Sequence, residues 1–133
     1  MKKILLAYDG GDPAKRALET AADLALVFDA SVSVISVVPF HPGRAPDQPG
    51  DERQAHADEL LEARELLFRR GLEVELLEPL GDPAKTIERI AEEGEYDTIV
   101  VGSRHLGALD RVLQGSVSEH VATHADATVV IAR

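Results

Sequence analysis

The sequence predicts a doubly wound α/β fold, an open five-stranded parallel sheet in the strand order 3-2-1-4-5 with helices on both faces. Apolar, β-branched segments alternate with segments of helical periodicity in a β-α-β-α-β-α-β-α-β order, which is typical of a parallel sheet. Right-handed crossovers leave few possible strand orders. The 133 residues suit a single domain, expected to span residues 1–133.

The N-terminal third predicts a strand, a helix and a second strand. Residues 3–8 (KILLAY) are apolar throughout, which is typical of a strand buried on both faces. Residues 13–28 have helical periodicity, with Asp12 as the expected N-cap and a proline in the first turn. The expected apolar face consists of Ala14, Ala17, Leu18, Ala21, Ala25 and Phe28. Residues 31–38 are rich in β-branched side chains and predict the second strand.

The middle of the chain predicts a loop, a helix and an edge strand. Residues 39–52 contain four of the seven prolines without periodicity, so we expect a mobile loop that acts as a partial lid. Residues 53–70 predict a helix, and Gly71 follows where a left-handed cap belongs. Its expected buried stripe consists of Ala57, Leu60, Leu61, Leu67 and Phe68. Residues 72–78 alternate in polarity, which indicates a strand at the sheet edge.

The C-terminal third begins with a repeated motif. Residues 81–85 (GDPAK) repeat residues 11–15, so the same helix-start chemistry is expected twice. The short helix that follows is expected to end near Gly94. The remaining predicted elements are a strand at residues 96–101, a helix at residues 116–125 and a last strand at residues 128–132.

Composition excludes several function classes. The formal net charge is −10, from 14 Lys and Arg against 24 Asp and Glu, so we expect neither a nucleic-acid nor a membrane partner. There is no cysteine for disulfides or thiolate metal sites. The N-terminal apolar run is too short for a signal peptide, and no run approaches the roughly 20 residues of a membrane span. A cytoplasmic location is therefore the expectation.

The predicted strand order indicates where a ligand binds. In open sheets of this class, ligands lie outside the carboxyl ends of the strands, at the switch point between strands 1 and 4. Those ends are Tyr8-Asp9 and Val101-Gly102. A glycine-bearing loop runs from Gly102 to Gly115-Ser116, where a predicted helix start favours an anion. From the residues alone, the loop is a phosphate site or a plain connection, and Asp9 is a ligand contact or a cap.

Metal binding and nucleophilic catalysis receive little support. His120 and His124 lie one helical turn apart, as zinc ligands do, but no third ligand accompanies them. Ser116 and His120 share one predicted helix, where their geometry suits capping better than a catalytic triad. His41 and His56 are interpreted as loop and surface residues. We therefore expect no catalytic residue and no metal ligand.

The stretch GSRHLGALDRVLQGSVSEHVATHA resembles the signature of the universal stress protein family. Nucleotide-binding members carry G-x2-G-x9-G-[ST], and Gly102, Gly115 and Ser116 match this pattern, with His105 in place of the second glycine. ILLAYDGG, GDPAKTI and YDTIVVGSR resemble other family segments, so the resemblance spans the chain. It implies the adenine nucleotide alpha hydrolase-like fold, which agrees with the predicted sheet.

The resemblance implies a site for ATP or a related nucleotide, ADP or AMP, with Mg as a companion of the phosphates. Asp9 would contact ribose or adenine, and the Val37 backbone would pair with the adenine edge. The cations of the loop are Arg104 and Arg111, either of which could pair with phosphate. The residues implied for the site are Ala7, Asp9, Val37, Gly102, Arg104, His105, Gly107, Gly115, Ser116, Val117 and Ser118.

The implied function is a regulatory, stress-response role with at most slow ATP hydrolysis, because no general base or positioned lysine is evident. One alternative is a dimeric interaction protein of the same fold that has lost nucleotide binding. Another is a true enzyme, such as a phosphotransferase. The resemblance also implies a homodimer through the last strand, with Thr128 in the interface and Val130 near its two-fold axis.

Overall fold

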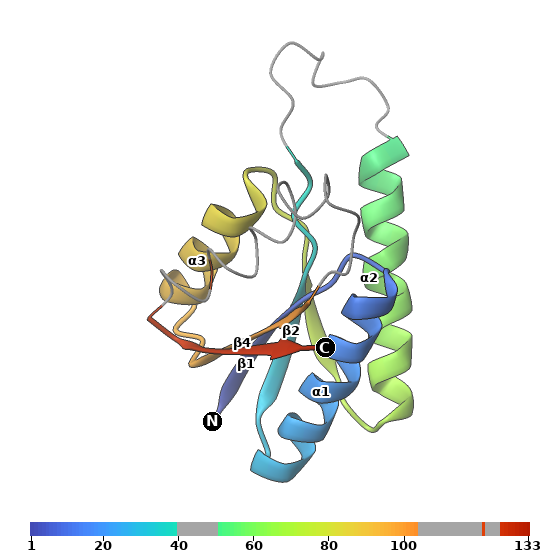
Figure 1. The fold of residues 1–133 in the computed structure, drawn as a ribbon. Helices are drawn as coiled ribbons and strands as arrows, with labels where there is room; N and C mark the ends of the chain where they lie inside the picture. Colours follow the sequence, from blue (N-terminus) through green and yellow to red (C-terminus); the bar gives the residue numbers. More distant parts are fainter. Residues whose placement is uncertain (40–50, 104–120, 122–125) are drawn as a thin grey trace.

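A computed structural model describes residues 1–39, 51–103, 121 and 126–133. Its centre is a five-stranded sheet in the order β3-β2-β1-β4-β5, in which every pair of neighbours is parallel (Figure 1). The strands are β1 Lys3–Ala7, β2 Ser31–Ile35, β3 Val74–Leu77, β4 Thr98–Gly102 and β5 Thr128–Ala132. The helices are α1 Asp12–Phe28, α2 Asp51–Arg69 and α3 Pro83–Glu93. The predicted fold class and strand order are confirmed.

Helices cover both faces of the sheet, and alternate residues of each strand enter different cores. Ile4 and Leu6 of β1 pack with residues of α1 and α2, whereas Leu5 packs with Ile87 of α3 and with Val121. All of these side chains are at most 4% exposed. Figure 1 shows α1 and α2 on one side of the sheet and α3 on the other. The two buried faces explain why the central strands are apolar without alternation.

An alanine-rich face holds α1 close to the sheet. The residues of this face that are at most 4% exposed are Ala14, Ala17, Leu18, Ala21, Ala22 and Ala25. The prediction that Phe28 is buried is wrong, because its side chain is 52% exposed. The helix ends at Phe28, before a left-handed Asp29 with φ 56°, and Ala25 is the last residue of α1 that enters the core.

The second helix covers the edge of the sheet with a narrower stripe than expected. Leu60, Ala63 and Leu67 are buried, but Leu61 and Phe68 are 49% and 66% exposed, so their predicted burial is wrong. Each follows directly after a buried residue of the stripe, Leu60 or Leu67, on a helix that lies over the edge of the sheet. The helix begins at Asp51, two residues earlier than predicted. Residues 40–50 lie outside the described residues.

The end of α2 has the predicted glycine cap. Gly71 has φ +84°, in the left-handed region that glycine adopts without strain. The N–H of Leu72 donates to the carbonyl of Leu67, and the N–H of Gly71 donates to that of Phe68. These two bonds form a Schellman motif, which pairs carbonyls that the helix end would otherwise leave open.

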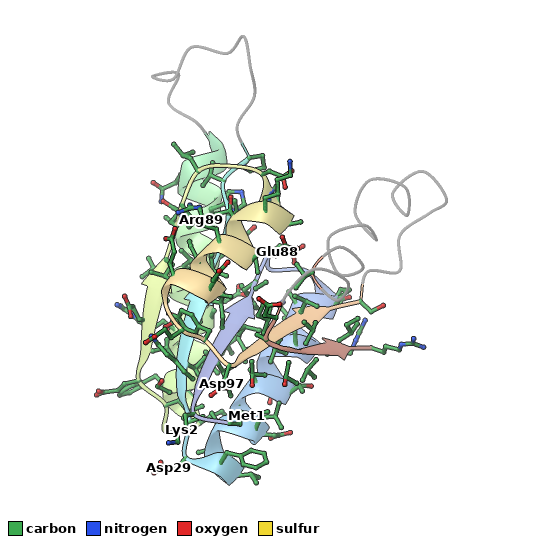
Figure 2. All side chains as sticks on the ribbon, turned by 90° about the vertical axis from the view of Figure 1, so that its left-hand side faces the viewer. Met1, Lys2, Asp29, Glu88, Arg89 and Asp97 are labelled. Atoms are coloured by element: carbon green, nitrogen blue, oxygen red, sulfur yellow. The ribbon has the colours of Figure 1, made fainter. Side chains whose placement is uncertain are left out.

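Asp97 joins two strands at the amino end of the sheet. Its Oδ2 accepts hydrogen bonds from the backbone N–H groups of Lys2 and Lys3, at 2.7 and 3.2 Å. Figure 2 shows Asp97 near Lys2 and Met1. Burial acts to raise the pKa of Asp97, but the hydrogen bonds from Lys2, Thr98 and Lys3 outweigh it and hold the pKa below its usual range.

The repeated GDPAK motif starts two helices in different ways, so the prediction of one shared chemistry is wrong. At α3, Asp82 is the N-cap, and its side chain accepts from the Lys85 N–H at 3.1 Å. At α1, Gly11 is the N-cap, and no side chain caps the helix. The first helical hydrogen bond of α1 is accepted by the carbonyl of Gly11, the first residue of the motif. In α3 the corresponding bond is accepted by the carbonyl of Asp82, the second residue of the motif. Asp12 therefore lies inside the first turn.

This difference predicts unequal effects of one substitution in the two motifs. Asp82→Ala should lower the free energy of unfolding by about 1 kcal/mol, because an N–H of the first turn of α3 loses its partner. The matched variant Asp12→Ala should cost less than about half as much, since it removes only a favourable charge near the helix N-terminus. Urea unfolding of both variants measures the two losses, and equal losses would contradict the assigned caps.

Candidate functional site

The carboxyl ends of β1 and β4 lie side by side at the centre of the sheet. Leu6 is in register with Val100, so the chain leaves both strands at the same edge. The strands that follow β1 in the chain, β2 and β3, lie on one side of it, whereas the later strands β4 and β5 lie on its other side. The order of the strands therefore reverses direction between β1 and β4. Ala7 and Asp9 are therefore brought together with Gly102 at a topological switch point, where open sheets of this class bind ligands.

Asp9 stabilises the turn between β1 and α1. Its Oδ1 accepts a hydrogen bond from the Gly11 N–H at 3.0 Å, as in an Asx turn. Gly10, at the middle of this turn, has φ +80°, a conformation that favours glycine. The half-buried Asp9 side chain thus has a structural role at the candidate site, and the turn holds its carboxylate in one place.

Gly102 allows the first turn of α1 to approach the end of β4. A Cβ at Gly102 would lie 2.5 Å from the carbonyl oxygen of Pro13 and 3.0 Å from the nitrogen of Ala14. Real Cβ atoms essentially never approach another atom as closely as 2.5 Å, so a residue with a Cβ does not fit here unless this backbone shifts. The N-terminus of α1 consequently lies against the switch point, where its dipole favours negative charge.

Val37 lies just beyond β2, which ends at Ile35 and so is shorter than the predicted strand. The N–H of Ser36 donates to Leu77, and that of Val38 donates to Pro79, so this segment still follows the chain beyond β3. The backbone of Val37 forms no hydrogen bond with another described residue. Its side chain is buried in the core on the α3 side. The N–H and carbonyl of Val37 are therefore without a hydrogen-bond partner among the described residues.

Much of the predicted phosphate loop lies outside the described residues. This applies to Arg104, His105, Gly107, Gly115, Ser116, Val117 and Ser118, and also to Arg111, His120 and His124. Of the predicted helix over residues 116–125, the structure describes Val121, which is helical and fully buried in the core on the α3 side.

A cluster of titratable side chains beside the Asp9 turn was not predicted. The Ser36 hydroxyl and His56 Nδ1 form a hydrogen bond, and the hydroxyl of Tyr8 donates to Glu62 Oε1 at 2.5 Å. His56 Nδ1 also lies 3.6 Å from Glu59 Oε2. The interpretation of His56 as a surface residue is wrong, because its side chain is only 19% exposed. His56, Glu59 and Glu62 are spaced three residues apart, which places them on one face of a helix. This spacing is the feature of the sequence from which the cluster could have been predicted.

The environment of this cluster disfavours negative charge. Burial is the main cause that raises the pKa of Tyr8, followed by its hydrogen bond to Glu62. Burial also raises the pKa of the Glu59 carboxyl, and the nearby charge of Glu62 adds to that effect. No group of three or more His, Cys, Asp or Glu side chains in the described part of the chain could hold a metal ion.

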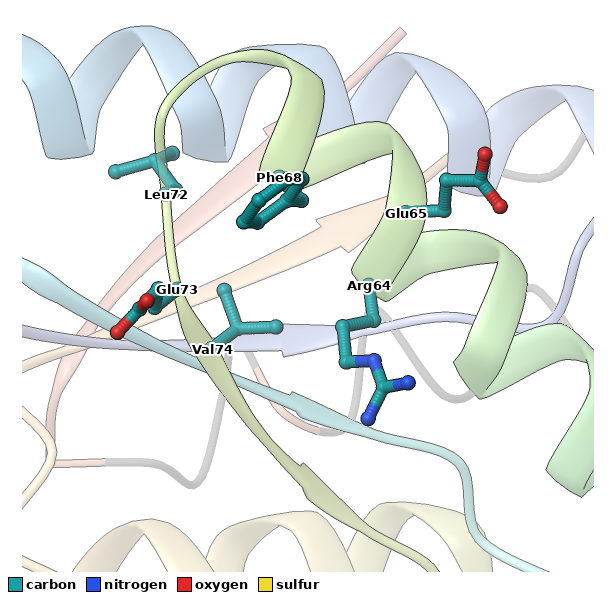
Figure 3. Close-up of a pocket in the computed structure, with 6 residues that line it drawn as sticks. All are labelled: Arg64, Glu65, Phe68, Leu72, Glu73 and Val74. Atoms are coloured by element: carbon teal, nitrogen blue, oxygen red, sulfur yellow. The ribbon is translucent and has the colours of Figure 1, made fainter.

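A separate hollow lies between the end of α2 and the start of β3. Its volume is about 540 Å³. Its lining residues are Arg64, Glu65, Phe68, Leu72, Glu73 and Val74 (Figure 3). In Figure 3, Phe68 and Val74 lie near each other, and Arg64 extends beside them from α2. Because β3 starts here, the hollow lies toward the amino ends of the strands, away from the switch point.

The whole chain matches a known family. The universal stress protein family model matches residues 1–133. The chain belongs to the universal stress protein family. It is 30% identical over 145 residues to universal stress protein YxiE of Bacillus subtilis, and the match covers 98% of each protein. None of the helices among the described residues is long and apolar enough to cross a membrane.

Solved universal stress proteins share this fold. One in complex with cAMP has a TM-score of 0.82 and 26% identity, and the match covers 99% of this chain and 97% of that one. The universal stress protein of Archaeoglobus fulgidus in complex with dAMP has a TM-score of 0.79 and 25% identity, covering 100% and 98% of the two chains. Both ligands are adenine nucleotides.

Proposed function

We propose that this universal stress protein binds an adenine nucleotide, AMP, ADP or ATP, at the carboxyl ends of β1, β2 and β4. The observation that carries the proposal is that Asp9, Val37 and Gly102 gather at the switch point of the sheet. The adenine nucleotides bound by two similar proteins support it. The role we propose is regulatory, in a stress response, in the cytoplasm that the sequence led us to expect.

The available groups suit an adenosine moiety. Adenine presents a donor and an acceptor side by side, and the Val37 carbonyl and N–H are the complementary pair. The Asp9 carboxylate can accept a hydrogen bond from a ribose hydroxyl. The N-terminus of α1 adds a favourable potential for the negative charge of the nucleotide. The residues proposed to bind phosphate, with Mg as a companion, are Gly115, Ser116, Val117 and Ser118, as the sequence motif implies.

Titration calorimetry with AMP, ATP and GMP tests this function. We expect saturable one-site binding of AMP and of ATP. GMP should bind at least tenfold more weakly, because guanine reverses the donor and acceptor that would face Val37. Mass spectrometry of the denatured protein should also release an adenine nucleotide. An empty protein that no adenine nucleotide saturates would favour the second candidate, an interaction protein that has lost nucleotide binding.

The replacement of a motif glycine by His105 is the observation that favours this second candidate. A histidine there either fills the space of the terminal phosphates or turns outward and donates a hydrogen bond to phosphate. We propose the outward arrangement, in which an ATP site survives in weakened form, and any hydrolysis at such a site is slow. Protonation of the imidazole would strengthen the hydrogen bond.

His105→Gly should therefore tighten ATP binding by about 1 kcal/mol, roughly fivefold, and change AMP binding little. The reason is that glycine adopts a left-handed backbone without the steric cost that a Cβ imposes. Calorimetry with both nucleotides measures the two changes. Equal effects on ATP and AMP would place His105 away from the distal phosphates.

We also propose a homodimer through the edge of β5, with Thr128 in the interface and Val130 near its two-fold axis. In the described chain, β5 pairs with β4 alone; its apolar residues Val129 and Val130 are half-buried, and Ile131 is exposed. An apolar edge of this kind is a template for pairing with a second chain.

A further inference from the structure

The turn that contains Asp9 rests on a glutamate of α2. A Cβ placed at Gly10 would lie 3.1 Å from Cγ and 3.4 Å from Cδ of Glu59. The side chain of Glu59 therefore borders the space that a Cβ on Gly10 would occupy, next to the turn. Gly10 lies between Asp9 and the α1 N-cap, so Glu59 lies next to the turn that holds the Asp9 carboxylate.

The charged surroundings of Glu59 are mostly acidic. From α2 itself, His56 Nδ1 lies 3.6 Å from Glu59 Oε2, and Glu62 lies one turn further along the helix. Directly after β1 comes Tyr8, whose hydroxyl donates to Glu62, and the turn contributes Asp9. Directly after β2 comes the uncharged hydroxyl of Ser36, which forms a hydrogen bond with His56. No lysine or arginine in the described residues forms an ion pair with Glu59 or Glu62.

One oxygen of Glu59 lacks the partner that a buried carboxylate needs. Oε2 is inaccessible to solvent and accepts no hydrogen bond from the described residues, although 29% of the side chain as a whole is exposed. An ionised carboxylate is costly in such a place, and a proton removes the cost. Burial and the charge of Glu62 both raise the pKa of Glu59, in agreement with this geometry.

We infer that Glu59 is a positioning residue for the Asp9 turn and that nucleotide binding at this turn is coupled to uptake of a proton by Glu59. The inference rests on the proposed nucleotide site. An anionic nucleotide adds negative charge next to the turn, which increases the proton affinity of the carboxylate beneath it. Linkage is reciprocal, so protonation of Glu59 strengthens nucleotide binding as the pH falls. The proton comes from solvent and forms an O–H bond on Glu59.

Calorimetric titration with AMP in two buffers of different ionisation enthalpy measures the proton uptake. The AMP phosphate also takes up or releases protons, and it does so equally with the wild type and with Glu59→Gln. The difference in proton uptake between the two proteins therefore isolates the contribution of Glu59. As the pH falls through the range in which Glu59 takes up its proton, the affinity of the wild type should rise relative to that of Glu59→Gln, by no more than the tenfold per pH unit that one linked proton allows. The uptake assigned to Glu59 should disappear in the variant.

Glu65→Gln is the matched control, because Glu65 lies on the same helix, is 67% exposed and pairs with Arg69. It should keep the proton uptake of the wild type. Undiminished uptake in Glu59→Gln would overturn the inference. Uptake that disappears only in His56→Gln would also overturn it, by assigning the proton to the imidazole.

Thermal unfolding without nucleotide separates this inference from the proposed function. The raised pKa of Glu59 means that its ionisation destabilises the folded state, and the stability is lost as the pH rises through that pKa. Glu59→Gln should therefore melt above the wild type at pH 8, and the difference should shrink as the pH falls. A difference that does not vary with pH would overturn the role of Glu59, whereas absence of AMP binding at every pH would contradict only the nucleotide site.

Discussion

Gly102→Ala should lower the free energy of unfolding by about 2 kcal/mol or more, and the melting temperature by roughly 7 °C. The new methyl group would lie 2.5 Å from the carbonyl oxygen of Pro13 and 2.6 Å from its carbon. Both atoms belong to backbone, so a rotamer change cannot relieve the overlap. The first turn of α1 must move away from the end of β4, and the Asp9 turn that precedes it must move as well.

Thermal and urea unfolding measure the loss of stability, and AMP titration at a temperature where the variant is folded measures the effect on the site. We expect weaker AMP binding, because the displaced turn carries Asp9. Ser103→Ala is the control, since the Ser103 backbone N–H, which donates to Ala132 at 2.7 Å, is kept. It should change stability by less than about 0.5 kcal/mol. Melting of Gly102→Ala within about 2 °C of the wild type would contradict the contact with α1.

Val130→Lys should weaken the proposed dimer at least roughly 100-fold, on the order of 3 kcal/mol. Val130 is in register with Val100 on the inner side of β5, and the outer side of the strand pairs with no described segment. In an antiparallel pairing of two β5 strands, the residues nearest the axis meet their own copies. The substitution would place two like charges together and remove apolar contact area from the interface.

Sedimentation velocity over a range of protein concentrations measures the dimer affinity. Ile131→Lys is a second variant with less risk to folding, because Ile131 is already 40% exposed. Val27→Lys is the matched control, since it adds the same charge to a valine that is 76% exposed on the last turn of α1. It should leave the dimer intact. A wild type that stays monomeric at every concentration would refute the interface.

Local patterns in the chain were sufficient to predict the sheet and the position of the candidate site. Strands buried on both faces are apolar along their whole length, so their positions can be predicted from the sequence. Glycine adopts φ +84° without strain, so Gly71 could be predicted to follow the end of a helix. The alternation of strands and helices then leaves few strand orders, and the order locates the switch point. The positions of strands and helix ends depend on residues that are close in the sequence, and the strand order follows from the handedness of crossovers, which is the same throughout this fold class.

Tertiary packing decided where two of the helices start and which apolar side chains are buried. Two identical GDPAK motifs start their helices at different positions, because the surrounding chain directs the first helical bond to Gly11 in one and to Asp82 in the other. Phe68 follows the apolar periodicity of α2, yet it stays exposed because β3 is the edge of the sheet.

The contact of Ser36 with His56 and that of Gly10 with Glu59 join segments that are far apart in the chain. A side chain's burial and its proton affinity depend on such partners, so they follow from the assembled fold and not from periodicity. Residue types and spacing therefore predicted the position of the candidate site, whereas the carboxylate cluster beside the Asp9 turn depends on the packing of α2 against the carboxyl ends of β1 and β2.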